Sequence, residues 1–206
     1  MPAPRRRQNP PRRWRPLTPL ARRRLPSRVR PWLVDGGSLT RQLRRACGDG
    51  FAVRLLAQHW RFADESEARR LGIAARSRLI EREVQLTCHG RPLVYARSLI
   101  PLAALRGSHR ELGAMGERPL GEKLFADPQM RRGSVHWRWL ARGEARYRRA
   151  LQGLTTRPPR LYGRCSLFHG AAAPVLVAEY FLPGLPRFPA SRVVTPAGWP
   201  TAPPVA

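Results

Sequence analysis

The amino-acid sequence predicts a single domain of mixed α and β structure whose strands pair in an antiparallel sheet. Two hairpins carry this prediction, because residues 79–101 and 161–182 each contain two apolar-rich runs separated by a short glycine-containing turn. A helix of ordinary length is predicted after Ser38, and a chain of 206 residues can enclose one complete hydrophobic core.

The first hairpin places an arginine among aliphatic side chains. Ile80, Arg82, Val84 and Leu86 share one face of its first strand, whereas the alternate positions, beginning with Glu81, are expected to face solvent. A guanidinium in such surroundings is costly to bury unless an anion meets it. Arg82 is therefore expected to have an anionic partner.

Glu179, in the last strand of the second hairpin, is the candidate partner. Residues 174–183 are apolar on both faces, so Glu179 is expected to be buried whichever way the strand is turned. Two interpretations follow. Arg82 and Glu179 form a structural salt bridge in the core, or a small molecule lies between them, with its carboxylate on the guanidinium and a hydroxyl at Glu179.

The chain is strongly basic, with a net charge of +26 at pH 7. Such a charge usually indicates nucleic acid or an anionic membrane surface as a partner. Lys123 is the only lysine, however, and the arginines are often spread singly through ordinary segments. We interpret much of the excess as a compositional bias toward arginine and expect a small-molecule ligand rather than nucleic acid.

The cysteines and histidines indicate no metal and no disulfide framework. Cys47, Cys88 and Cys165 are odd in number and widely spaced, and the five histidines lack the spacing of a metal site. A reduced, cytoplasmic protein without a metal is therefore expected.

Both ends of the chain are expected to be disordered, which leaves residues 31–183 as the folded domain. Residues 1–30 are rich in arginine and proline, and residues 184–206 form a proline-rich tail; neither contains an acidic residue. The N-terminal arm is expected to bind polyanions weakly at most. No apolar segment is long enough to cross a membrane, and none resembles a signal peptide.

The remaining elements follow from local signals along the chain. Ser38 is a plausible N-cap for a helix that ends at Gly48, and residues 51–58 alternate as a strand. Residues 63–75 are expected to form a loop with a turn or two of helix, and residues 102–112 to be helical. Arg118 to Phe125 is predicted to form a Pro-Leu-Gly loop followed by a short helix. Residues 130–151 are predicted to form a basic surface helix, with stacking on nucleic-acid bases as the alternative.

Six short motifs, taken in order, resemble the chorismate pyruvate-lyase family. They extend over roughly residues 32–183, and their order carries the resemblance, since no single motif is specific. The motifs are G-S-L-T at 37–40, R-E-V-x-L-x-x-x-G-x-P at 82–92, A-R-S-L-I-P at 96–101, P-L-G-x-x-L-F at 119–125, L-Y-G-R-x-S at 161–166 and E-Y-F-L-P at 179–183.

The resemblance implies an α+β domain with a curved antiparallel sheet of about six strands and an internal ligand cavity under two helical flaps. It also implies conversion of chorismate to 4-hydroxybenzoate and pyruvate, the first step of ubiquinone biosynthesis, in a cytoplasmic monomer that needs no cofactor. The family's substrate-binding residues correspond to Leu39, Arg82, Leu120 and Glu179, with Arg82 and Glu179 as the catalytic pair; other members carry methionine at the position of Leu39. Arg97 either supports the anion or faces water from its strand.

Two other functions remain open at this point. One is a non-catalytic effector-binding domain of the same fold, which would bind a small carboxylate without turning it over. The other is a basic nucleic-acid-binding protein, whose affinity would fall steeply with salt.

Overall fold

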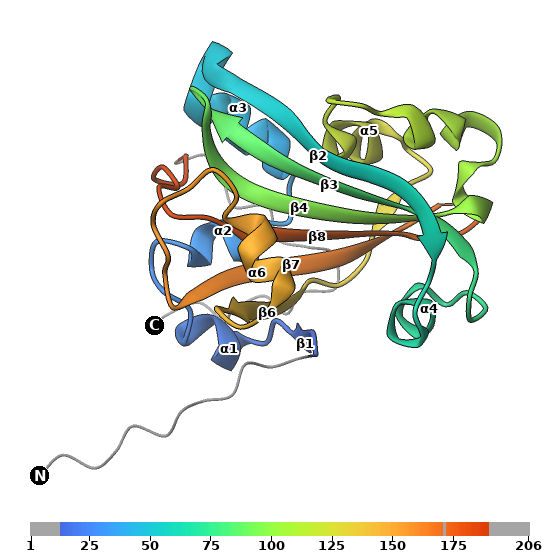
Figure 1. The fold of residues 1–206 in the computed structure, drawn as a ribbon, viewed down its shortest axis with the longest axis horizontal. Helices are drawn as coiled ribbons and strands as arrows, with labels where there is room; N and C mark the ends of the chain where they lie inside the picture. The colour runs from blue at the N-terminus through green and yellow to red at the C-terminus, as the bar shows by residue number, and fades with distance from the viewer. Residues whose placement is uncertain (1–12, 171, 190–206) are drawn as a thin grey trace, which may run out of the picture.

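An antiparallel sheet of eight strands forms the centre of the molecule in the computed structural model, which describes residues 13–170 and 172–189 (Figure 1). The strand order is β1-β6-β7-β8-β4-β3-β2, and β5 pairs with β7 beside this path. The strands are β1 (Arg15–Pro16), β2 (Phe51–Phe62), β3 (Arg78–Cys88), β4 (Arg91–Pro101), β5 (Arg131–Arg132), β6 (His136–Ala141), β7 (Arg160–His169) and β8 (Val175–Phe181). Six of these described strands are longer than two residues, so the predicted α+β fold with about six strands is confirmed.

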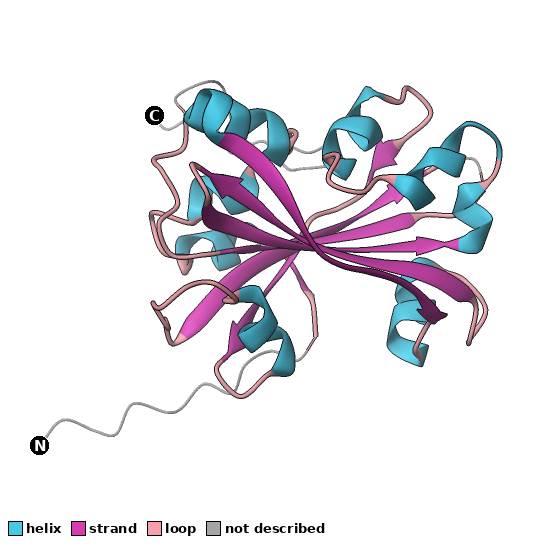
Figure 2. Ribbon diagram, turned by 45° about the horizontal axis from the view of Figure 1, so that its top comes forward, coloured by secondary structure: helices cyan, strands magenta, loops and turns pink. Residues whose placement is uncertain are grey.

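Helices lie on both sides of this sheet (Figure 2). The α-helices are α1 (Pro19–Arg23), α2 (Arg30–Val34), α3 (Leu39–Cys47), α4 (Glu65–Leu71), α5 (Leu120–Ala126) and α6 (Ala145–Ala150). The 3₁₀ segments are η1 (Gly48–Gly50), η2 (Leu102–Leu105) and η3 (Gly107–Ala114). The helical segments predicted for 63–75 and 102–112 thus correspond to α4 and to η2 with η3.

The central hairpin of β3 and β4 forms as predicted. Its turn residues, His89 and Gly90, have φ angles of 47° and 76°, the left-handed pair that a tight two-residue hairpin requires. The second predicted hairpin also forms, with β7 paired antiparallel to β8.

Strand register defines the two faces of the sheet. Arg82 pairs with Ser98, Ser98 with Val177, and Val177 with Ser166. Paired residues point to the same side, so these four side chains form one row across four strands, and Glu179 lies on the same face one row further along β8. We call this side the Arg82 face and the opposite side the Arg97 face.

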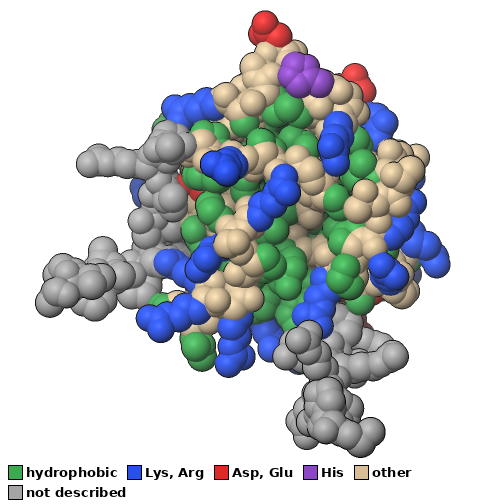
Figure 3. All heavy atoms as spheres, turned by 90° about the vertical axis from the view of Figure 1, so that its left-hand side faces the viewer, with side chains coloured by type: hydrophobic (Ala, Val, Ile, Leu, Met, Phe, Trp, Pro, Cys, Tyr) green, Lys and Arg blue, Asp and Glu red, His purple; other side chains and the backbone are tan. Residues whose placement is uncertain are grey.

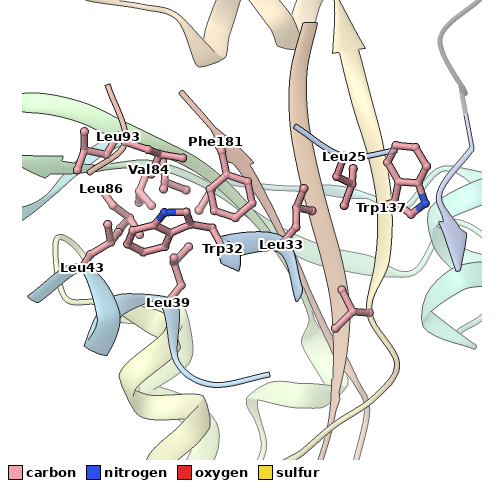
Figure 4. Packing of buried hydrophobic residues seen from close by; sticks show 14 of the residues in the cluster. Leu25, Trp32, Leu33, Leu39, Leu43, Val84, Leu86, Leu93, Trp137 and Phe181 are labelled. Carbon is pink, nitrogen blue, oxygen red and sulfur yellow. The ribbon is translucent and has the colours of Figure 1, made fainter. Parts of the chain in front are cut away.

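Two apolar clusters cover the Arg82 face. In the first, Trp32 of α2 and Leu39 and Leu43 of α3 pack against Val84 and Phe181 of the sheet (Figure 4). The second joins Leu120 and Leu124 of α5, and residues of η2 and η3, to the opposite end of the same face. The predicted capping of α3 is confirmed, because the Ser38 hydroxyl accepts a hydrogen bond from the Arg41 N–H at 3.3 Å and Gly48 ends the helix at φ 54°.

The Arg97 face is buried, contrary to the prediction of a solvent-facing side for β3. Helices α4 and α6 pack against it, so that Glu81 is 9 % exposed and Gln85 fully buried. Arg97 lies on this face rather than facing water or supporting the anion: it is 7 % exposed and pairs with Glu67 at 2.6 Å and with Glu81. The predicted alternation of β3 is confirmed, but its polar face is covered, because polar side chains that form hydrogen bonds and ion pairs with one another can be buried.

The predicted helix over residues 130–151 is wrong. This segment contains β5, β6 and then α6. Trp137 and Trp139 point with β6 toward the first apolar cluster, and β6 pairs with β7 along its whole length. Pairing with a neighbouring strand outweighed the local helical pattern.

The folded domain begins earlier and ends later than residues 31–183. Strand β1 and helix α1 precede residue 31, and Leu17 and Leu25 are each only 4 % exposed. At the other end Leu185 is 2 % exposed, and its carbonyl accepts a hydrogen bond from Arg28 Nη2 at 2.6 Å. The expected disorder is therefore wrong for residues 13–30 and 184–189, whereas residues 1–12 and 190–206 lie outside the described residues.

A disulfide also departs from prediction. Cys47 at the end of α3 is bonded to Cys88 at the end of β3, 41 positions further along the sequence, and Cys165 is a buried free thiol. Spacing along the chain carried no signal for this pair, because only the packing of α3 beside the central hairpin brings the two sulfurs together.

Two further features concern partners. No helix in the described part of the chain is long and apolar enough to cross a membrane, and these residues contain no cluster of three or more potential metal ligands. On the face drawn in Figure 3, the basic side chains are dispersed singly and in small groups among apolar and neutral ones.

Candidate functional site

Polar and charged side chains cross the Arg82 face between its two apolar clusters. Ser98 is 3 % exposed, Ser166 1 % and Arg82 2 %, and all three belong to the same row of the sheet. Charged groups in such a position must be paired, hydrogen-bonded or matched by a ligand.

Arg82 has hydrogen-bond partners but no counter-ion. Its Nη2 donates to the carbonyls of Gly116 and Arg118, at 2.8 and 2.9 Å. Its Nε is buried without a partner, and no carboxylate among the described residues forms an ion pair with it. Burial accordingly lowers the pKa of Arg82 to about 10, which leaves it charged at neutral pH. Because Nη2 donates to two carbonyls, the N–H donors that Arg82 keeps for an anion are those of Nε and Nη1.

Glu179 pairs with a different arginine. Its Oε2 lies 2.6 Å from Nε of Arg164, and the two residues face each other across β7 and β8. Arg164, whose side chain is 1 % exposed, also donates from Nη1 to the carbonyls of Trp32 and Asp35, at 2.8 and 2.5 Å. A direct Arg82–Glu179 salt bridge, one of the two interpretations of the sequence, is therefore absent from the described residues.

The other two predicted residues, Leu39 and Leu120, lie at the N-terminal ends of the helices that cover this face. Leu39 is 3 % and Leu120 4 % exposed, and each is the first residue of its helix. The two helix starts approach closely, since a Cβ on Gly121 would lie 3.1 Å from Oγ1 of Thr40. Arg82 donates hydrogen bonds to carbonyls of the segment immediately before α5. Arg82, Leu39 and Leu120 thus lie around one side of the sheet, while the enclosed cavity and the binding roles stay predictions.

An ion pair holds the two helices together at the surface. Arg44 of α3 and Glu122 of α5 are 2.6 Å apart, and their side chains are 52 % and 41 % exposed. An exposed pair of this kind contributes little energy. The pair therefore adds little to what holds α3 and α5 in place, because both helices also bury leucines in the two apolar clusters.

Three residues of this region escaped the sequence prediction of the site. Arg164 and Ser166 stand in the L-Y-G-R-x-S motif, where the period of two residues places them on one face of β7. Arg132 belongs to the two-residue strand β5, and its Nε donates to Oγ of Ser166 at 3.0 Å. The alternation of β7 was a usable signal for the first two, whereas a two-residue strand gives none.

The Arg97 face has a pocket of its own, which the sheet separates from Arg82. It has a volume of about 580 Å³ and is lined by Arg97, Tyr180 and residues of α4, among others. Its buried charges are matched internally, because Glu67 accepts hydrogen bonds from both Arg61 and Arg97 at 2.7 and 2.6 Å. The Arg82 face is the better candidate for a ligand site, since Arg82 has no counter-ion among the described residues.

Two solved structures share the fold of this chain. The ligand-binding domain of a putative GntR-family regulator from Bordetella bronchiseptica aligns with a TM-score of 0.51 at 19 % identity, covering 70 % of this chain and 93 % of that one. The effector domain of PhnF from Mycobacterium smegmatis aligns with a TM-score of 0.52 at 17 % identity, over 71 % and 89 % of the respective chains. At these identities the likeness concerns the fold alone: an α+β domain of the type used by these regulators.

The sequence comparisons identify the family. The chorismate lyase family model matches residues 13–191. A probable chorismate pyruvate-lyase from Azoarcus sp. is 43 % identical over 169 residues, covering 79 % of this chain and 89 % of the relative. Another from Aromatoleum aromaticum is 41 % identical over 170 residues, covering 82 % and 91 %. The chain belongs to the chorismate lyase family.

Proposed function

We propose that the protein is a lyase that converts chorismate to 4-hydroxybenzoate and pyruvate. The observation that carries the proposal is Arg82, a buried arginine that keeps its charge and its Nε and Nη1 donors, with no counter-ion among the described residues. An anionic ligand is what such a group lacks, and family membership supplies the kind of ligand.

In this proposal Arg82 binds the ring carboxylate of chorismate, and Leu39 and Leu120 close over the ring from the starts of α3 and α5. Glu179 accepts a hydrogen bond from the ring hydroxyl. Its pairing with Arg164 fixes the carboxylate, leaving one oxygen for the substrate. Arg82 and Glu179 are thus the proposed catalytic pair, and Leu39 and Leu120 also bind the substrate.

The reaction is an elimination. The bond between the ring carbon and the ether oxygen breaks with its electron pair going to oxygen, and the ring hydrogen beside the hydroxyl leaves as a proton. The released enolpyruvate gains a proton at its methylene carbon and becomes pyruvate, so no electrons are gained or lost overall. Because the ring becomes aromatic, orientation and charge stabilisation account for the catalysis, and we propose that no cofactor takes part.

The cellular setting is a further part of the proposal. We place the enzyme in the cytoplasm as a monomer, where its product would enter ubiquinone biosynthesis. The Cys47–Cys88 disulfide counts against a cytoplasmic location, because disulfides are uncommon in reducing compartments such as the cytoplasm. Trapping thiols in intact cells before lysis would determine the state of the pair in its own compartment.

The decisive experiment is incubation of the purified protein with chorismate in the presence of EDTA. We expect 4-hydroxybenzoate and pyruvate to appear in equal amounts. Binding of chorismate or 4-hydroxybenzoate without turnover would instead support an effector-binding domain. Activity that vanishes on removal of a metal and returns when the metal is restored would overturn the cofactor-independent mechanism.

A further inference from the structure

The charge of the proposed substrate exceeds what Arg82 alone can match. Chorismate carries two carboxylates, one on the ring and one on the enolpyruvyl group, and Arg82 meets the first. Arg164 is not available for the second, because Glu179 already neutralises it at 2.6 Å. A second arginine without a counter-ion is therefore required if both carboxylates are to be bound in the protein.

Arg132 meets this requirement. Its Nε donates to Oγ of Ser166 at 3.0 Å, and its Nη1 donates to the carbonyl of Gly36 at 2.9 Å. Its guanidinium carbon lies 5.7 Å and 5.9 Å from the ring centres of Phe125 and Phe168. Among the described residues, no carboxylate forms an ion pair with Arg132, and its Nη2 donates no hydrogen bond. The group is thus held in place while one of its donor nitrogens stays available.

The electrostatic surroundings of Arg132 agree with this description. Burial, followed by the nearby charge of Arg164, lowers the pKa of Arg132 to about 9, and Glu179 is the first of the groups that oppose the shift. The group therefore remains charged at neutral pH. An arriving carboxylate would relieve both its desolvation and its repulsion by Arg164.

The position of Arg132 also fits the geometry of chorismate. The ether oxygen of the enolpyruvyl group is attached to the ring carbon next to the one that carries the hydroxyl. If the hydroxyl lies at Glu179, the second carboxylate must lie on the Glu179 side of the ring. Arg132 is on that side: it bonds Ser166 of β7, and Ser166 pairs with Val177, two residues before Glu179 on β8.

We propose that Arg132, positioned by Ser166 and the Gly36 carbonyl, binds the enolpyruvyl carboxylate and holds the leaving group while the ether bond breaks. This subsite rests on the proposed lyase function and adds to it a basis for selecting dicarboxylates. Arg82 then contacts both substrate and product, whereas Arg132 contacts only the part of the substrate that leaves as pyruvate.

The roles of Arg82 and Arg132 can be distinguished by comparing chorismate, a dicarboxylate, with 4-hydroxybenzoate, a monocarboxylate. We expect Arg132→Gln to lower kcat/KM for chorismate by about a hundredfold while the Kd for 4-hydroxybenzoate changes less than about threefold. Arg82→Met should weaken both. Arg131→Gln, which alters the exposed neighbour on the same strand, is the matched control and should change neither. Arg132→Lys should recover part of the loss, since it restores charge without the planar fork.

The possible outcomes distinguish failure of the proposed lyase function from failure of the proposed Arg132 subsite. If wild-type protein does not turn over chorismate, the proposed function fails. If it does, and Arg132→Gln behaves like Arg131→Gln, only the subsite is overturned. Equal loss of chorismate turnover and 4-hydroxybenzoate binding would make Arg132 structural. Should Arg132→Gln fold poorly, Ser166→Ala provides the same comparison, because it removes the Nε acceptor and leaves the guanidinium present.

Discussion

Replacing Arg82 with methionine should abolish recognition of the ring carboxylate while leaving the fold almost as stable as before. The substitution removes the donor of two hydrogen bonds, to Gly116 and Arg118, which costs about 1–3 kcal/mol for each carbonyl that stays buried. It also removes a desolvated charge. A pKa of about 10 in place of 12.5 corresponds to roughly 3 kcal/mol of relief. The two effects oppose each other, so we expect the free energy of unfolding to fall by no more than about 3 kcal/mol.

The effect on activity should be much larger. Hydrogen bonds between a guanidinium and a carboxylate contribute about 1.5–3 kcal/mol each, so losing two of them should reduce kcat/KM by roughly 10²- to 10⁴-fold. Arg82→Lys should recover only part of this, because an ammonium is a point charge. Formation of 4-hydroxybenzoate measures the kinetics, and urea denaturation measures stability. Arg78→Met, at the exposed start of the same strand, is the control.

Two results would refute this reasoning. The first is an Arg82→Met protein that keeps kcat/KM and product affinity within about tenfold of wild type, since the carboxylate would then bind elsewhere. The second is a loss of several kcal/mol of stability together with wild-type protein whose melting temperature does not rise when 4-hydroxybenzoate is added. That combination would make Arg82 a structural residue.

Three further predictions concern the surrounding structure. Glu179→Gln leaves buried Arg164 without its carboxylate, so chorismate turnover should fall and urea denaturation should show a loss of about 3–5 kcal/mol; unchanged stability would contradict the buried ion pair. Hydrogen bonds from arginines, against the opposing effect of burial, lower the pKa of Glu67 from 4.5 to about 2, so its contribution to stability is complete above pH 4.5 and is lost as the pH falls toward 2. Thermal melts at a series of pH values should show a weaker acid dependence in Glu67→Gln, and equal acid sensitivity would refute this role. Reducing the Cys47–Cys88 bond, whose half-cystines are 41 residues apart, should lower the free energy of unfolding by about 4 kcal/mol; denaturation curves that are identical with and without reductant would show that the bond is not formed in solution.

Local patterns were sufficient for much of the architecture. Alternation over β3 and β8, together with the apolar runs that form β4 and β7, predicted both hairpins, because a strand's side chains point to opposite faces whatever the strand pairs with. Ser38 and Gly48 predicted the limits of α3, because a helix end must satisfy its backbone groups within a few residues. Burial of the N-terminal segment was missed, because Leu17 and Leu25 pack against distant parts of the chain while their neighbours are arginine and proline.

The inward orientation of Arg82 and Glu179 could be predicted from the chain alone, because strand period and neighbouring apolar residues are local properties. The pairing of the charges depends on how the strands are arranged in the sheet. Strand β8 lies between β7 and β4, so Glu179 pairs in register with Arg164 and with Ala96, and Arg82 is one strand further away on β3. An ion pair depends on the order of strands in the sheet, and spacing along the chain does not encode that order. Within the described part of the chain Arg82 was thereby left without a counter-ion, the feature on which the proposed site depends.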